Sequence, residues 1–358
     1  MEKRENLLID YGYSVYQEKV DDIEAYRDIE KGRVISQHKN FYEVIMSYGI
    51  VKAQISGKYL YNVEEYGGYP VVGDYVGVRI VDDIAIIVTL LPRVTMFFRK
   101  DMWHKESVQV LASNFDTILI CSSMNNDFSI RRIERYVILA KVSGADIAII
   151  LTKADLCNDV QEKVMICKKN FKEIPVYAIS IKQETGYEEI RKYFNEHITV
   201  LLLGSSGVGK SSLVNYLSGQ KIMDTGSIRE DDDKGRHTTV RRQIIKMNSG
   251  GLVVDTPGLR EVGITNSDEV IEDMFEDICI LEQQCKFRNC THKGEKGCAV
   301  IQALHDGKLS RERYATYVKF KLENQILNDR GGYMYNKWQR SKQRTTNERI
   351  IRKLKRGK

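Results

Sequence analysis

The stretch that decides the fold is Ile198-Thr-Val-Leu-Leu-Leu203, followed by Gly204-Ser-Ser-Gly-Val-Gly-Lys-Ser211 and by Ser212-Leu-Val-Asn-Tyr-Leu-Ser218. The first segment is typical of a buried strand, the second matches the phosphate-loop pattern, and the third has helical spacing. Glycines let the backbone N–H groups and the helix N-terminus face an anion. We therefore predict a nucleotide phosphate site formed by Gly204, Ser205, Ser206, Gly207, Val208, Gly209, Lys210, Ser211 and Ser212.

A second motif, Asp255-Thr-Pro-Gly258, follows another apolar strand. A carboxylate at such a strand end can hold Mg²⁺, together with the hydroxyl of Ser211. The backbone N–H of Gly258 can meet a γ-phosphate. This layout occurs in both ATPases and GTPases, so it leaves the choice of base open.

The base is addressed by Thr152-Lys153-Ala-Asp155, which again follows a buried strand, and by Ser180 at the end of a further strand. The carboxylate of Asp155 can accept two hydrogen bonds from guanine N1 and N2, which adenine cannot offer. The stem of Lys153 can lie over the base. Together with the phosphate loop, these residues favour GTP, although Thr152 stands where the commoner motif has asparagine.

The order of the motifs is unusual. In ordinary GTPases the phosphate loop comes first, whereas here residues 152–155 and Ser180 precede residues 204–211, which precede Asp255. Cutting one loop and joining the old termini changes connectivity but not spatial neighbours. Residues 112–265, in which strands alternate with helices, are therefore expected to form a circularly permuted α/β P-loop GTPase domain.

Upstream, residues 31–95 contain five short stretches rich in Val, Ile and Tyr, separated by Gly, Asn and Asp. This pattern predicts a small β-barrel such as an oligonucleotide-binding (OB) fold. Candidate RNA contacts on it are Arg33, Lys39, Lys52, Lys58, Tyr42 and Tyr59, although at each single position an ordinary solvated surface residue is the more common case. Residues 1–30 allow no assignment, and residues 96–111 are expected to be a linker.

Downstream, residues 266–330 are expected to be mainly helical and to bind zinc. Cys285, Cys290, His292 and Cys298 place four sulfur or nitrogen ligands within 14 residues. Zn²⁺ favours such a tetrahedral set. Four protein ligands leave no position for a catalytic water, so we expect one structural Zn²⁺.

The positive charge of the chain is concentrated at its end. The segment Lys337–Lys358 carries ten Lys/Arg and one acid, a balance of +9, whereas the other 336 residues carry 45 basic and 48 acidic residues. A basic tail over residues 331–358 indicates a polyanionic partner.

The sequence has no secretory signal at its start, no run of about 18 apolar residues and an odd, modest number of cysteines. We therefore expect a cytoplasmic protein with reduced thiols and no membrane partner. We also expect it to be a monomer.

The barrel, the permuted GTPase motifs and the cysteine cluster together resemble the ribosome small subunit-dependent GTPase A (RsgA) family over roughly residues 30–330. The resemblance implies a GTP hydrolase that binds the small ribosomal subunit and its rRNA, acts in late maturation, and is stimulated by the subunit. The alternative is a GTP-dependent switch for a non-ribosomal protein or RNA partner.

The resemblance also bears on catalysis. Many GTPases orient the attacking water with a Gln after the motif glycine, but this chain has Leu259 there. The segment Gly235-Arg-His-Thr-Thr239 resembles the switch motif of the family. This implies that His237 orients the water and that Thr238 or Thr239 ligates Mg²⁺, with Thr239 preferred.

Overall fold

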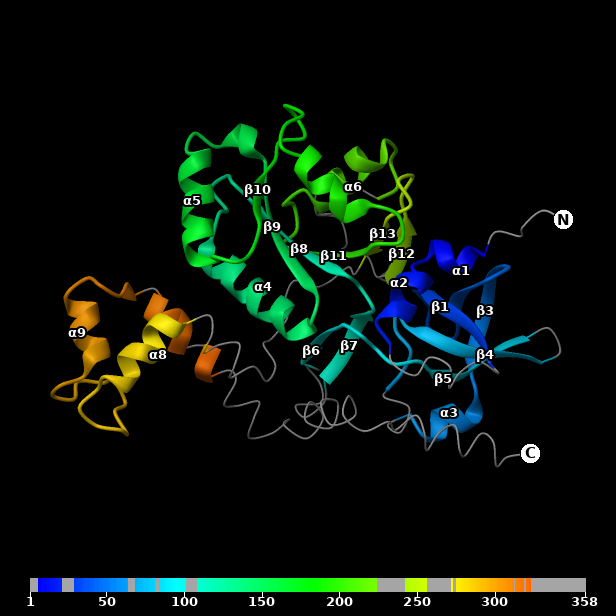
Figure 1. Cartoon of the computed structure of the whole chain (residues 1–358), viewed down its shortest axis with the longest axis horizontal. Helices are drawn as coiled ribbons and strands as arrows, with labels where there is room; N and C mark the ends of the chain where they lie inside the picture. The colour runs from blue at the N-terminus through cyan, green and yellow to red at the C-terminus, as the bar shows by residue number, and fades with distance from the viewer. Residues whose placement is uncertain are drawn as a thin grey trace, which may run out of the picture.

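The computed structural model describes residues 6–20, 29–63, 68–81, 84–100, 108–223, 242–255, 272, 275–311, 313–318 and 320–322. Figure 1 shows the N-terminal barrel (blue) at one end, an α/β domain (cyan to green) in the middle, and helices α8 and α9 (yellow and orange) at the other end. Within these ranges, no helix is both long and apolar enough to cross a membrane.

The predicted five-stranded barrel is confirmed. Its strands are β1 (Glu30–Gln37), β2 (Tyr42–Met46), β3 (Gly49–Ile55), β4 (Tyr75–Val81) and β5 (Ile84–Leu90). They pair in the order β1-β2-β3-β5-β4, and β4 returns to pair with β1, so the sheet closes on itself. The interior is filled by small and branched apolar side chains, including Val34, Val44, Ala53, Val76 and Ile87. Closure leaves the barrel without free strand edges.

Three of the proposed RNA contacts lie inside the protein, so that prediction was wrong for them. Tyr59 is 0% exposed, Arg33 is 1% exposed and Tyr42 is 8% exposed. Tyr59 belongs to a short helix, α3 (Gly57–Tyr61), and it packs into the barrel core. By contrast, Lys39, Lys52 and Lys58 are exposed.

The middle of the chain forms the expected parallel sheet. Its strands are β8 (Thr117–Ser123), β9 (Asp146–Thr152), β10 (Val176–Ala178), β11 (Thr199–Leu203) and β13 (Leu252–Asp255), with β12 (Arg242–Lys246) antiparallel to β13. The spatial order is β10-β9-β8-β11-β13-β12. The phosphate-loop strand β11 therefore lies centrally, between the strand that begins the domain and the strand that ends at Asp255.

Helices cover both faces of this sheet, so its strands are buried on both sides. The helices are α4 (Ile130–Ser143), α5 (Val160–Asn170) and α6 (Lys210–Ser218), with 3₁₀ segments at Ala154–Leu156 and Glu188–Phe194. Ile118 and Ile120 pack with α4 and α5, whereas Leu119 and Cys121 pack with α6. This alternation explains the continuous apolar runs that predicted the strands.

Two stretches without a predicted fold contain regular structure. Residues 96–111, the expected linker, include β6 (Met96–Lys100) and most of β7 (Val108–Ser113), which pair with each other. Residues 1–30 include two short helices, α1 (Leu7–Asp10) and α2 (Tyr13–Glu18). Beyond the sheet, the chain forms α8 (Glu276–Gln283) and α9 (Ala299–His305), and residues 311–322 are helical where described.

The barrel and the α/β domain share one sheet, because β12 pairs with barrel strand β1. The registered pairs are Ser36 with Gln243 and Gln37 with Arg242. Strand β12 thus joins β13, which ends at Asp255, to the barrel. The sequence did not predict this pairing, which depends on two segments about 200 residues apart.

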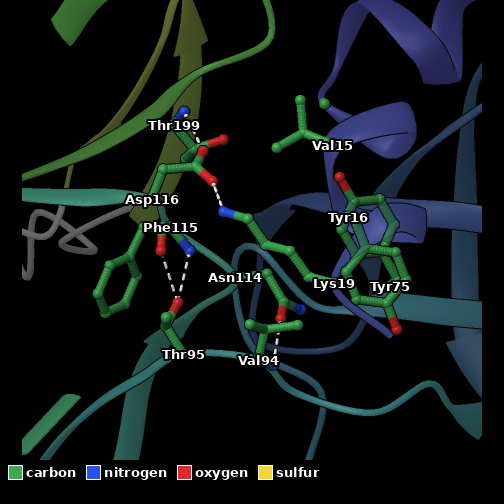
Figure 2. A pocket seen from close by; sticks show the side chains of 11 residues that line it. Val15, Tyr16, Lys19, Tyr75, Val94, Thr95, Asn114, Phe115, Asp116 and Thr199 are labelled. Carbon is green, nitrogen blue, oxygen red and sulfur yellow. Dashed lines mark hydrogen bonds and ion pairs between the residues drawn. The ribbon is translucent and has the colours of Figure 1, made fainter. Parts of the chain in front are cut away.

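The N-terminal helices lie over the junction between barrel and sheet. Figure 2 shows Lys19 pointing from the N-terminal segment to Asp116, and Tyr16 lying against Tyr75. Lys19 Nζ lies 2.5 Å from Asp116 Oδ1, and the two tyrosine rings stack with centroids 4.0 Å apart. On the other side, Lys246 of β12 pairs with Asp10 at 2.7 Å. The N-terminal segment therefore contacts both the barrel and the α/β domain.

Arg33 occupies the centre of this junction. Its guanidinium donates to the backbone oxygens of Tyr11 and Asn114, each at 2.6 Å, and to the hydroxyl of Thr199 at 3.0 Å. These acceptors come from the N-terminal helices, from the segment before β8 and from the first residue of β11. Buried cations are tolerated only when such partners replace water. Arg33 is thus a structural link between three segments rather than an RNA contact.

Candidate functional site

The proposed phosphate loop lies between the buried strand β11 and helix α6. Gly204, Gly207 and Gly209 all have positive φ angles, of 144°, 75° and 101°. A Cβ atom on Gly204 would stand 2.3 Å from the backbone oxygen of Cys121, so only glycine fits there. The Nζ of Lys210 donates to the oxygens of Gly204 and Ser205, each at 2.7 Å. These contacts hold the ammonium at the loop, beside the first turn of α6, where an anion would be stabilised.

The proposed base motif contacts this loop directly. The hydroxyl of Thr152 donates to the oxygen of Val208 at 2.5 Å, and Lys153 Nζ donates to the oxygen of Gly207 at 2.7 Å. Threonine thus holds the two motifs together although the commoner asparagine is absent. The sequence contains no signal for these contacts, because the partners are more than 50 residues apart and depend on the strand order.

The proposed guanine carboxylate has its own support. Ser180, at the end of β10, donates from its hydroxyl to Asp155 Oδ1 at 2.6 Å. Ser180 is fully buried, and its backbone pairs with Thr185. One carboxylate oxygen of Asp155 is thus held by the Ser180 hydroxyl. The four residues Thr152, Lys153, Asp155 and Ser180, drawn from two neighbouring strands, lie on one side of the phosphate loop.

On the other side of the loop lie the residues proposed for magnesium. Ser211 and Asp255 line the same surface depression, together with Gln243 and Lys221. Burial raises the pKa of Asp255, and the ammonium of Lys210 acts in the opposite direction. A bound divalent cation would favour the ionised carboxylate in the same way. The remaining predicted residues, His237, Thr239 and Gly258, lie outside the described residues.

The cysteine cluster has the geometry of a metal centre. The ligand atoms of Cys285, Cys290, His292 and Cys298 all lie within 4.8 Å of one another. Sγ of Cys285 and of Cys298 are 3.9 Å apart, and His292 Nδ1 lies 3.3 Å from Cys298 Sγ. In a tetrahedral Zn²⁺ site, bond lengths of about 2.0–2.3 Å place the ligand atoms about 3.5–3.8 Å apart. The four residues therefore fit a bound zinc-sized ion.

The loop that carries the histidine ligand is held by Glu295. Its carboxylate accepts from the backbone N–H groups of Thr291 and Lys293, each at 2.8 Å, and from the Thr291 hydroxyl at 2.6 Å. These bonds lower the pKa of Glu295 to about 2. His292, between the two bonded residues, has a positive φ of 56°. The sequence pattern predicted the four candidate ligands but not this supporting carboxylate.

Comparison with known sequences agrees with this geometry. The family model described as RsgA GTPase matches residues 90–265, a range that also includes the β6–β7 pair. The small ribosomal subunit biogenesis GTPase RsgA 2 of Lactiplantibacillus plantarum is 42% identical over 293 residues, which is 82% of each chain. The small ribosomal subunit biogenesis GTPase RsgA of Leptospira interrogans is 36% identical over 338 residues, or 92% of each chain.

Solved structures agree as well. The crystal structure of YjeQ from Thermotoga maritima is 25% identical, covers 82% of this chain and 98% of its own, and superposes with a TM-score of 0.58. YloQ, described as a circularly permuted GTPase, shares the fold with a TM-score of 0.55 over 83% of this chain and 96% of its own. Taken with the matching family model and the long sequence matches, these findings show that the chain belongs to the RsgA family of circularly permuted GTPases.

Proposed function

We propose that this protein is a GTP hydrolase that binds the small ribosomal subunit, acts in its late maturation and is stimulated by the subunit. The observation that carries the proposal is the contact of Thr152 and Lys153 with the phosphate loop. It supports a single nucleotide site in which the carboxylate of Asp155 recognises the base. The ribosomal partner is proposed from the names of relatives that match 82% and 92% of this chain.

In the proposed complex, the backbone N–H groups of residues 204–212 and the ammonium of Lys210 receive the phosphates. Asp155 accepts from guanine N1 and N2, and the stem of Lys153 covers the base. Ser211, Asp255 and Thr239 would hold Mg²⁺, which would neutralise charge on the phosphate oxygens. Gly258 would offer its N–H to the γ-phosphate.

Hydrolysis requires an oriented water, and Leu259 cannot orient one. We assign that role to His237. We expect His237→Ala to lower subunit-stimulated GTP turnover by about 10²-fold or more, with GDP affinity unchanged. His305→Ala, which removes an exposed histidine of α9, is the matched control. Equal stimulated turnover in the His237→Ala variant and in that control would exclude this role.

The proposed partner suits the modules that flank the nucleotide site. OB-type barrels present a face to nucleic acid, and the tail with its balance of +9 offers phosphate-neutralising charge. Strand β12 begins at Arg242, three residues after Thr239, and pairs with barrel strand β1. A loop that responds to the γ-phosphate would thus lead directly into β12, which is hydrogen-bonded to the barrel. Docking of the barrel on rRNA could then affect hydrolysis through this strand.

The decisive experiment measures GTP turnover of the full chain alone, with purified small subunits, with large subunits and with anionic lipid vesicles. The proposal predicts strong stimulation by small subunits only. Co-sedimentation should show tighter binding with a non-hydrolysable GTP analogue than with GDP. If only lipid vesicles stimulate GTP turnover, or if no ribosomal particle does, the alternative of a GTP-dependent switch for a non-ribosomal partner is favoured. We further propose a cytoplasmic monomer with one structural Zn²⁺.

A further inference from the structure

A carboxylate outside the four proposed ligands lies against the metal centre. Glu282 stands in the last turn of α8, three residues before Cys285. Its Oε1 lies 3.2 Å from Nε2 of His292. The other ring nitrogen, Nδ1, lies 3.3 Å from Cys298 Sγ and 3.7 Å from Cys285 Sγ. The imidazole is therefore placed between a carboxylate on one edge and the thiols on the other.

We propose that Glu282 is the positioning residue that makes His292 an Nδ1 ligand of the metal. The inference rests on the zinc site proposed above. A neutral imidazole carries one N–H, so a carboxylate that only accepts hydrogen bonds places the proton on the nitrogen it faces. That nitrogen is Nε2, which leaves the Nδ1 lone pair directed at the thiols. Such carboxylate–histidine pairs orient the ring and increase its basicity as a ligand.

The carboxylate of Glu282 also contacts the C-terminal helical residues. Oε2 accepts from the Tyr317 hydroxyl at 2.9 Å and from Lys321 Nζ at 3.0 Å. Both residues belong to the helical stretch 311–322, which precedes the basic tail. Lys321 Nζ also lies 3.3 Å from Oε1, so Glu282 bridges the metal loop and this helix. Metal binding and the anchoring of the helix are coupled through one side chain.

The position of His292 explains why outside support is needed. Its backbone has a positive φ of 56°, a conformation that is unfavourable for an L-residue. The ring is 11% exposed and Glu282 is 22% exposed, so water competes only partly for their contact. The loop fold and the Glu282 contact together hold the ring in its place.

The first test is zinc affinity of the full chain, measured by competition with a chromophoric chelator. Glu282→Gln is expected to weaken Zn²⁺ binding roughly 10–100-fold. Glu276→Gln changes an exposed residue of the same helix and should bind as the wild type does. Tyr317→Phe removes a partner of Oε2 but retains the contact with His292, and should also retain wild-type affinity.

The second test reads the ring directly and needs no variant of Glu282. In the zinc-loaded wild-type chain with ¹⁵N-labelled histidine, the His292 resonances should show a proton on Nε2 and metal on Nδ1, with slow exchange of the Nε2 proton. Metal on Nε2 would overturn the proposal, as would equal zinc affinity in the Glu282→Gln and Glu276→Gln variants. A wild-type chain that binds no Zn²⁺ would refute the metal site itself, which is a separate outcome.

Discussion

At the scale of single residues, Thr152 carries a contact that its motif does not reveal. The pattern of residues 152–155 predicted guanine recognition from residue types alone, and the structure adds the bond from the Thr152 hydroxyl to Val208 O. Residue identities can be inferred from a motif because each chemical task needs a particular group. Which groups touch depends on how separate segments pack together, so the contacts of Glu282 and Arg33 could not be assigned from sequence.

Thr152→Ala should weaken GDP binding. The change removes a hydroxyl that is buried and leaves the Val208 oxygen without that donor, at a cost of about 1 kcal/mol, or roughly fivefold in affinity. Titration with a fluorescent GDP derivative measures it. Thr152→Ser keeps the hydroxyl and is the control. If the Ala and Ser variants bind GDP equally, the hydrogen bond from residue 152 to the Val208 oxygen does not contribute to GDP binding.

At the scale of elements, the predictions succeeded where a repeating pattern was long. The strands of the parallel sheet are buried on both faces and gave continuous apolar runs, and α4 has helical spacing over 14 residues. Helices α1 and α2 span only 4 and 6 residues. Such short helices are stabilised by tertiary contacts rather than by propensity. The pairing of β12 with β1 likewise joins segments that show no common pattern.

Arg33→Met should destabilise the folded chain strongly, since it removes the donor shared by the oxygens of Tyr11 and Asn114 and by Thr199. Loss of a buried charged donor costs about 3 kcal/mol or more. The midpoint of urea unfolding should fall accordingly. Lys39→Met is the matched control, because Lys39 is exposed on the same barrel. Equal midpoints for the two variants would contradict the role given to Arg33.

At the scale of the whole molecule, one side chain joins the C-terminal helices to the GTPase domain. Arg313 makes a two-bond contact with Asp277 of α8, at 2.7 and 2.8 Å, and reaches Glu134 of α4 at 3.3 Å. The guanidinium also lies 4.9 Å from the ring centroid of Phe275. Burial raises the pKa of Glu134, and Arg313 acts in the opposite direction. The contact with Glu134 therefore compensates a buried negative charge.

Arg313→Leu should lower the stability of the chain at neutral pH by about 2 kcal/mol, because it leaves the Glu134 carboxylate buried without this cation. Glu134 has a raised pKa, so its folded form favours the neutral acid. The loss of stability in the Arg313→Leu variant should therefore become smaller as the pH falls and Glu134 takes up a proton. Unfolding midpoints across pH test this. Asp277→Asn alters only the exposed partner of Arg313 and should change the stability little. A loss of stability in Arg313→Leu that does not vary with pH would exclude Glu134 as its cause.

The tail gives the last prediction, because most of the excess charge of the molecule belongs to it. Each Lys or Arg that neutralises a phosphate adds about 0.7–0.9 to the slope of log affinity against log salt concentration. Deleting residues 337–358, which carry ten Lys/Arg, should therefore weaken binding to small subunits most at low salt. If about four of them contact rRNA, the slope should fall by about three. Basal GTP turnover should not change, since the residues proposed for the nucleotide site all lie within 152–258. Parallel salt dependences with and without the tail would show that the folded domains alone meet the rRNA phosphates.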